Sequence, residues 1–139
     1  SAAVGGLWLG LFRHDLHLST GRNQLCTRPV AEVLFESIEF RQAALRWHVR
    51  LALLMPDHLH MLVSFPLQEA LPRVVANFKE CTAKRVALEW QRDFFDHRLR
   101  GDESLDEKAS YIRMNPVRAG LVACAELWPW VWTPASAAG

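Results

Sequence analysis

The hydrophobic pattern is clearest in the middle of the chain, where two adjoining stretches alternate between apolar and polar residues. Residues 47–55 repeat with a period of two, which is typical of a β-strand with two different faces. A Met-Pro-Asp turn follows, and residues 58–66 alternate again. The two stretches therefore predict an antiparallel hairpin. One face of its first strand should consist of Trp47, Val49, Leu51, Leu53 and Met55.

Further strand and helix patterns surround this hairpin. The period of two also appears in residues 14–20 and 94–100, which predicts two more strands. Apolar residues recur at helical spacing in residues 28–46 and 68–91, and each stretch predicts an amphipathic helix. The first helix is expected to bury Val30, Val33, Leu34, Ile38 and Leu45, and the second Leu71, Val74, Val75, Phe78 and Val86.

A short helix completes the pattern. Ser104 and Glu107 have the spacing of a capping box, and Pro116 disfavours helical geometry in the residue before it, so this helix should end near Asn115. The order of elements is β-α-β-β-α-β-α. Its first six elements match a ferredoxin-like fold of the α+β class, an antiparallel βαββαβ sheet with two helices on one face. A length of 139 residues suits a single domain, residues 1–139.

Composition is that of an ordinary soluble globular domain, with 50% apolar and 22% charged residues. No apolar run reaches the length of a membrane span, and the first residues lack the pattern of a signal peptide. Cys26, Cys81 and Cys124 are odd in number, widely spaced and free of any Cys-x-x-Cys motif, which favours a reducing cytosol. We therefore expect a cytoplasmic protein without membrane contact.

The charge balance leaves the class of partner open. The net charge is +1, but residues 71–100 hold seven basic against four acidic residues. A local excess of this kind is sufficient for a nucleic-acid-binding face. A solvated helix face explains the same charges equally well.

Two histidines, His58 and His60, stand one residue apart on the second strand of the predicted hairpin. Successive side chains of a strand point to opposite faces, so these two imidazoles project the same way and could share a metal ion. In the alternative interpretation His58 caps the turn and His60 is a half-buried polar residue. The pair alone does not decide between a metal site and ordinary structure.

The last predicted helix carries a second pair of candidates. Tyr111 is the only tyrosine of the chain, and Asn115 follows it one turn later on a stripe separate from the apolar one. Together they would offer a nucleophilic hydroxyl and a neutral oxygen ligand. Alternatively, the tyrosine ring packs in the core and hydrogen-bonds its hydroxyl, and Asn115 only ends the helix.

Three motifs change this balance: MPDHLHMLVSFP, WQRDFFDHRLRGDESL and YIRMNPVRAGLV. In this order and at these separations they resemble the signatures of the single-tyrosine (HUH) transposases of the IS200/IS605 type, and in particular of the REP-associated tyrosine transposases. The resemblance extends from about residue 46 to residue 130. It implies the fold derived above, with a C-terminal helix that carries the catalytic tyrosine.

The resemblance also implies a role for each candidate residue. The metal site of the family falls on His58 and His60, its third ligand on Asn115, and its nucleophile on Tyr111. This mixed ligand set suits Mg²⁺ or Mn²⁺ and also admits Ni²⁺ or Zn²⁺. The implied reaction is cleavage of single-stranded DNA through a 5′-phosphotyrosine link, which leaves a free 3′-hydroxyl and so permits rejoining without ATP.

The implied substrate is single-stranded DNA beside a hairpin, in this branch the repetitive extragenic palindromes of bacterial chromosomes. Family members act as monomers or homodimers, and some donate the tyrosine helix to a partner's site. Two other functions stay open: a DNA-binding regulator without catalysis, and a metal-dependent phosphodiesterase that uses water. Candidate phosphate contacts are the basic residues Lys79, Lys84, Arg98, Arg100, Arg113 and Arg118.

An aromatic tail follows the last helix, with Trp128, Trp130 and Trp132 at alternating positions. Nucleic-acid bases could stack on these rings. Closure of an edge of the core is the favoured interpretation, because tryptophan is mostly buried and the segment also contains Pro129 and Pro134.

Overall fold

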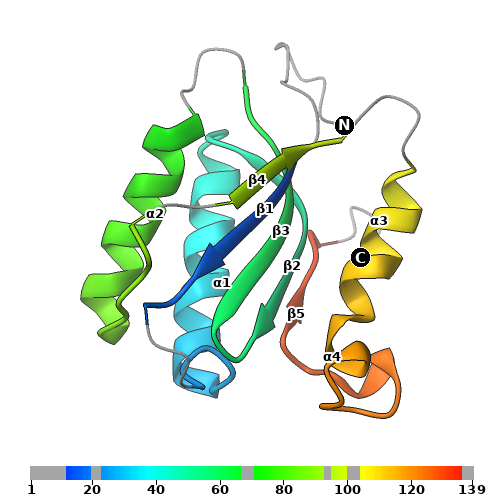
Figure 1. Cartoon of the computed structure of the whole chain (residues 1–139). Helices are drawn as coiled ribbons and strands as arrows, with labels where there is room; N and C mark the ends of the chain where they lie inside the picture. The colour runs from blue at the N-terminus through cyan, green and yellow to red at the C-terminus, as the bar shows by residue number, and fades with distance from the viewer. Residues whose placement is uncertain (1–11, 20–22, 67–70, 93–94, 100–103, 136–139) are drawn as a thin grey trace.

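An antiparallel sheet forms the centre of the computed structural model (Figure 1). The structure describes residues 12–19, 23–66, 71–92, 95–99 and 104–135. Within these ranges the sheet has five strands in the order β4-β1-β3-β2-β5, so β1 and β3 lie side by side at its centre. The strands are β1 (Phe12–His17), β2 (His48–Met55), β3 (His58–Ser64), β4 (Phe95–Arg98) and β5 (Val131–Trp132).

Helices lie on both sides of this sheet. Figure 1 shows α1 and α2 together on one side, and α3, followed by α4, on the other. This arrangement confirms the ferredoxin-like βαββαβ fold with two helices on one face of the sheet. In the described part of the chain no helix is long and apolar enough to cross a membrane. The helices are α1 (Arg28–Ala43), α2 (Leu71–Val86), α3 (Leu105–Arg113) and α4 (Asn115–Arg118), with a 3₁₀ turn at Ala125–Leu127.

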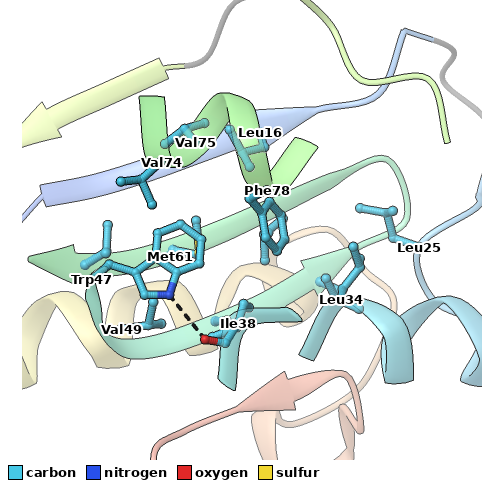
Figure 2. Close-up of a cluster of buried hydrophobic side chains, with 14 of the residues drawn as sticks. Leu16, Leu25, Leu34, Ile38, Trp47, Val49, Met61, Val74, Val75 and Phe78 are labelled. Carbon is cyan, nitrogen blue, oxygen red and sulfur yellow. Dashed lines mark hydrogen bonds between the residues drawn. The ribbon is translucent and has the colours of Figure 1, made fainter. Parts of the chain in front are cut away.

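The main core lies between the sheet and the pair α1 and α2, and is called the α1/α2 core below. Figure 2 shows how its aromatic and aliphatic side chains interdigitate. Trp47 is fully buried there and its ring lies 5.5 Å from that of Phe78, centroid to centroid. The indole N–H donates to the Ile38 carbonyl at 3.2 Å, so the one polar atom of this large side chain is paired (Figure 2).

A β-bulge in β2 corrects the predicted faces of this strand. The pairing with β3 shifts between Val49 and Leu51, so Arg50 is an extra residue and the alternation changes by one position. Trp47 and Val49 belong to the α1/α2 core, as predicted for one continuous face. Beyond the bulge that prediction was wrong, because the opposite side of the sheet receives Leu51, Leu53 and Met55.

These three residues form part of a second buried cluster, called the α3-side cluster, through which α3 packs on the sheet. Ile112 of α3 is 1% exposed and packs there, with Leu105 and Ala109 of the same helix at its edge. The α3-side cluster therefore holds the C-terminal helix against the sheet. Its buried members are Leu51, Leu53, Met55, Leu62, Leu99 and Ile112.

Both long helices end earlier than their apolar patterns predict. After α1, Leu45 has a φ of 60°, and after α2, Ala87 has a φ of 53°. Backbone in this left-handed region leaves the helix, which terminates α1 and α2 before residues 46 and 91. Leu45 is 60% exposed, so its predicted burial was wrong. Of the second predicted helix, residues 68–70 lie outside the described ranges.

The capping prediction for the last helix is confirmed. The hydroxyl of Ser104 accepts a hydrogen bond from the Glu107 backbone N–H at 3.2 Å, and α3 begins directly after it. The helix ends at Arg113, as the proline argument predicted. Pro116 then occupies the first turn of α4, where a missing N–H costs nothing.

The aromatic tail closes the β2 edge of the sheet. β5 pairs with β2, and the Leu54 backbone N–H donates to the Trp130 carbonyl at 2.9 Å. Trp130 and Trp132 pack against the α1/α2 core, whereas Trp128 packs on the α3-side cluster and donates its indole N–H to the Leu54 carbonyl at 2.9 Å. The expectation that this segment covers an edge of the core is confirmed.

The cysteines provide a first test of the fold. All three are free, and Cys124 is exposed. Burial raises the pKa of the Cys26 thiol to about 12, and its Sγ donates to the Leu54 carbonyl at 3.5 Å. Because the thiolate is the reactive species, iodoacetamide at pH 8 should alkylate Cys26 at least about 100-fold more slowly than Cys124. Peptide mass spectrometry over time measures both rates. Equal rates in the folded protein, or no acceleration at Cys26 in urea, would contradict this packing.

Candidate active site

His58 and His60 lie on the same face of β3, as the alternation predicted. Leu62, two residues further on the same strand, belongs to the α3-side cluster, so this is the face toward α3. The rings meet edge to face with centroids 4.4 Å apart, and the two Nε2 atoms are 2.8 Å from each other. The two imidazoles thus converge on one point.

β1 brings two further polar side chains to this point, and the sequence had not assigned either to a site. Asp15 lies opposite His60 in the β1–β3 register, and His17 lies opposite His58. Asp15 Oδ1 is 2.6 Å from His60 Nδ1. The His17 ring stacks on the His58 ring, with centroids 4.6 Å apart and an interplanar angle of 13°.

The turn before β3 supplies a second carboxylate. Asp57 Oδ1 lies 2.7 Å from His58 Nδ1. Because a carboxylate only accepts hydrogen bonds, each of the two histidines must place its proton on Nδ1, which leaves a lone pair on each Nε2. Two lone pairs facing each other across 2.8 Å repel unless a proton or a cation lies between them. Histidines held by a carboxylate at the second ring nitrogen are typical of metal ligands.

The surroundings of His58 and Asp15 shift the pKa of both groups. Burial, the largest effect, lowers the pKa of His58, and the neighbouring imidazoles His60 and His17 lower it further, against the opposing bond to Asp57. Burial alone would raise the pKa of Asp15, but the hydrogen bond to His60 and the charges of His60, Arg13 and His58 hold it below its ordinary value. At neutral pH the cluster therefore contains an ionised Asp15 and a neutral His58.

These shifts predict how stability depends on pH. Because the folded chain disfavours protonated His58, the unfolded chain binds more protons below the ordinary pKa of 6.5, and stability falls as pH falls through that window. The stability that ionised Asp15 contributes is lost only in stronger acid, below its ordinary pKa of 3.8. In chelator-treated protein the urea midpoint should be lower at pH 5.5 than at pH 8. His48, whose pKa burial and Arg50 also lower, contributes with the same sign.

The variant His58→Gln isolates the part of this pH dependence that comes from the cluster. In this variant the urea midpoint should fall less between pH 8 and pH 5.5, and the remaining decrease should come from His48. An unchanged slope in this variant would contradict the assignment of the titration to His58.

The remaining ligands of a metal would have to be of another kind. Among the described residues, no group of three His, Cys, Asp or Glu side chains is arranged to hold a metal ion. The third ligand predicted from the sequence is the amide oxygen of Asn115. Asn115 is half-buried at the start of α4, where its Oδ1 accepts a hydrogen bond from Arg118 Nη2.

Tyr111 lies on α3, next to the buried Ile112. Its side chain is 56% exposed, so the alternative in which the ring is part of the core was wrong. The Arg118 guanidinium lies over the ring at 3.9 Å from its centroid. In Figure 1 the C-terminal end of α3 points toward the end of the sheet that holds the turn between β2 and β3.

The structure thus forms two groups on the same side of the sheet. His58 and His60 are joined with their carboxylates, and Tyr111 is joined with Asn115 through Arg118. Within the described ranges no hydrogen bond links one group to the other. The packing of Ile112 in the α3-side cluster is the contact that places both groups on this side.

The predicted phosphate contacts are spread over both layers. Lys79 and Lys84 belong to α2, on the opposite side of the sheet; Lys79 Nζ donates to the Gln91 carbonyl at 2.5 Å, and Lys84 Nζ lies 3.9 Å from a Glu80 carboxylate oxygen.

The arginine candidates are similarly divided. Arg98 lies opposite Phe12, whose side chain packs on the α1/α2 core. The Arg98 side chain therefore points to the α1/α2 side of the sheet, away from the histidines. Arg100 lies outside the described residues. Only Arg113 and Arg118, on α3 and α4, share the layer of the histidines.

Comparison with known proteins identifies the family. The model of the family described as "Transposase IS200 like" matches residues 13–114. The chain belongs to the IS200-like transposases. The matched stretch includes His58, His60 and Tyr111 and ends one residue before Asn115. The resemblance inferred from the three motifs is thereby confirmed.

Individual relatives agree with this family. A protein of Haemophilus influenzae that bears the name REP-associated tyrosine transposase is 30% identical, over 55% of this chain and 53% of its own length. The chain thus spans about half the length of this curated relative. The solved structure of a REP-associated tyrosine transposase bound to a REP hairpin aligns with a TM-score of 0.78 and 21% identity, over 92% of this chain and 79% of that one.

A transposase structure from Deinococcus radiodurans R1 aligns with a TM-score of 0.56 and 18% identity. It covers 79% of this chain and 93% of that one. At these identities the two solved structures establish the shared fold.

Proposed function

We propose that this member of the IS200-like transposases cleaves and rejoins single-stranded DNA beside hairpins, through a covalent link between Tyr111 and a 5′-phosphate. The observation that carries the proposal is the convergence of His58 and His60, with their Nε2 atoms 2.8 Å apart and a carboxylate on each Nδ1. These two nitrogens could bind a cation, and the only tyrosine of the chain lies on the helix that packs against the same face of the sheet. This combination suits phosphoryl transfer better than DNA binding alone.

The donor set agrees with a divalent metal. Imidazole nitrogens are ligands between hard and soft in character, and an amide oxygen from Asn115 would make the set suitable for Mg²⁺ or Mn²⁺. When bound, the cation would neutralise charge on a phosphate oxygen and orient the phosphorus for in-line attack. Asp15 and Asp57 would keep both Nε2 lone pairs available by accepting the Nδ1 protons.

The chemical step belongs to Tyr111. Its oxygen loses the phenol proton and forms a bond to phosphorus, while the bond from phosphorus to the 3′-oxygen breaks and that oxygen takes up a proton. One phosphate ester replaces another, so no external energy is needed. The reverse attack by a 3′-hydroxyl then rejoins a strand and releases the tyrosine.

The substrate class rests on the relatives. One solved relative was determined with a REP hairpin, which supports hairpin DNA as the ligand of this chain. Arg113 lies on α3, is exposed, and shares the layer of the histidines, so it is the best placed of the candidate phosphate contacts. Tyr111 could act in the site of its own chain or in that of a homodimer partner, and the mixing experiment below distinguishes the two.

A single experiment separates the three functional classes. The protein is incubated with Mg²⁺ or Mn²⁺ and a hairpin oligonucleotide that has a single-stranded flank, labelled at the 3′ end in one sample and at the 5′ end in another. A 5′-phosphotyrosine link transfers only the 3′ label to the protein and leaves a 5′-labelled fragment that a polymerase extends. Cleavage without any labelled protein indicates a phosphodiesterase that uses water, and binding without cleavage indicates a regulator.

Mixing two inactive variants tests the dimer. If Tyr111→Phe and His60→Ala chains together recover adduct formation, the tyrosine of one chain serves the histidines of the other. If the mixture stays inactive while each parent binds DNA, both groups act within one chain.

A further inference from the structure

Arg118 makes three contacts with the two residues proposed to act at the end of α3. Its Nη2 donates to the Tyr111 carbonyl at 2.7 Å and to Asn115 Oδ1, and its guanidinium carbon lies 3.9 Å from the centroid of the Tyr111 ring. No other side chain in the described structure has a hydrogen bond or ring contact with both residues. Arg118 therefore connects the tyrosine and the amide through one rigid group.

The turn between α3 and α4 makes these contacts possible. α3 ends at Arg113 and α4 begins at Asn115, with Met114 between them and Pro116 in the first turn of α4. This change of direction lets a residue seven positions after Tyr111 fold back over its ring, with backbone bonds from Arg118 to Met114 and from Ala119 to Asn115 holding α4. The placement of Arg118 is thus part of the fold of this segment.

Each contact restricts one degree of freedom that the reaction would use. A guanidinium stacked on the phenol ring limits rotation of an otherwise exposed side chain. A hydrogen bond to Asn115 Oδ1 fixes which end of the amide is the oxygen, and an amide oxygen retains a second lone pair for another partner. Both effects orient a reacting or ligating atom without touching the DNA.

We infer that Arg118 is a positioning residue for catalysis: it holds the Tyr111 ring in its attacking orientation and presents the Asn115 oxygen, and it is not primarily a phosphate contact. This inference rests on the proposed function of Tyr111 and Asn115. It changes the role that the sequence suggested for Arg118, because the guanidinium is engaged within its own chain. Lysine cannot substitute fully, since an ammonium lacks the planar fork and the stacking face.

The single tyrosine allows a direct test of the ring contact. Chain labelled with 3-fluorotyrosine gives one ¹⁹F resonance. In Arg118→Ala this resonance should move toward that of free fluorotyrosine and sharpen, because the ring loses the guanidinium that covers it. Arg113→Ala is the matched control, since it removes an exposed arginine of α3, the helix that carries Tyr111. In the described structure Arg113 makes no contact with the ring, so the resonance of this variant should stay at the wild-type position.

Kinetics then separate positioning from DNA binding. At saturating hairpin DNA, Arg118→Ala should form the covalent adduct about 10- to 100-fold more slowly than the wild type. Arg118→Lys should still form it about tenfold more slowly than the wild type. The dissociation constant for DNA should change much less than the rate. Wild-type melting temperatures in the two variants establish that both remain folded.

Several outcomes would overturn the inference. A ¹⁹F resonance that does not move in Arg118→Ala shows that the ring is not held. Recovery of the wild-type rate at saturating DNA, or full activity of Arg118→Lys, shows that the positive charge acts on the phosphate. If instead the wild-type chain forms no adduct at all, the proposed function fails and the catalytic role fails with it, whereas the ¹⁹F shift still decides whether Arg118 holds the ring.

Discussion

Replacement of Tyr111 by phenylalanine is expected to reduce formation of the covalent protein–DNA adduct by about 1000-fold or more, because the attacking oxygen is removed and nothing else changes. The phenyl ring still offers a face to the Arg118 guanidinium. Tyr111 is 56% exposed, so no buried contact of the α3-side cluster is lost. Adduct formation is measured by the shift of labelled DNA into the protein band of a denaturing gel.

Binding of hairpin DNA and the melting temperature should stay at their wild-type values in Tyr111→Phe. Ser110→Ala is the matched control, since it removes the neighbouring exposed hydroxyl of α3 and should keep adduct formation. A Tyr111→Phe protein that still becomes attached to DNA would reveal another nucleophile. Undiminished cleavage without attachment would point to water as the attacking group.

Replacement of His60 by alanine is expected to weaken Mn²⁺ binding by about 100-fold or more, because one of two converging Nε2 ligands disappears. Titration calorimetry of the free protein measures this change independently of DNA. The variant also leaves the Asp15 carboxylate without its partner at 2.6 Å, so a loss of stability of about 1–3 kcal/mol should accompany it.

Two further variants calibrate the metal measurement. Asp15→Asn keeps both imidazoles but removes the carboxylate that fixes the His60 tautomer. The affinity for Mn²⁺ should therefore fall by about 10- to 100-fold. His97→Ala removes an exposed histidine of β4 and should leave Mn²⁺ affinity unchanged. Equal affinity in wild type and His60→Ala would refute a metal site at the histidine pair.

Local periodicity predicted the parts of the fold that depend on a few neighbouring residues. The alternation of β3 put His58 and His60 on one face, and the capping box set the start of α3. The same reasoning was wrong for β2 beyond Arg50, because one extra residue reverses a period of two without any signal in the apolar pattern. It also extended α1 and α2 too far, since Leu45 and Ala87 adopt left-handed backbone that their residue types do not indicate.

The polar partners of the histidines illustrate what local patterns omit. The period of two in residues 14–20 implies that Asp15 and His17 share a face of this strand, and this was the only signal for them in the sequence. That this face meets the histidines depends on the register of β1 against β3, between residues 45 positions apart. Register is determined by burial of Leu16 and Leu59 on the other face, and this is a property of the assembled core.

The sequence by itself therefore determined the order of the first seven elements and the shared face of the two histidines, because backbone geometry sets these from nearest neighbours. It also indicated the family, through the resemblance carried by three motifs, and the position of Asn115 four residues after Tyr111. Only the tertiary structure decided that Asp15 and Asp57 fix the tautomers of the histidines, that the bulge at Arg50 turns an apolar face toward α3, and that Arg118 folds back over Tyr111. The contact of Asp15 with His60 requires pairing between segments 45 positions apart, whose free energy no local pattern contains. Asp57 and Arg118 lie close to their partners in the sequence, but apolar periodicity does not predict a polar side-chain contact.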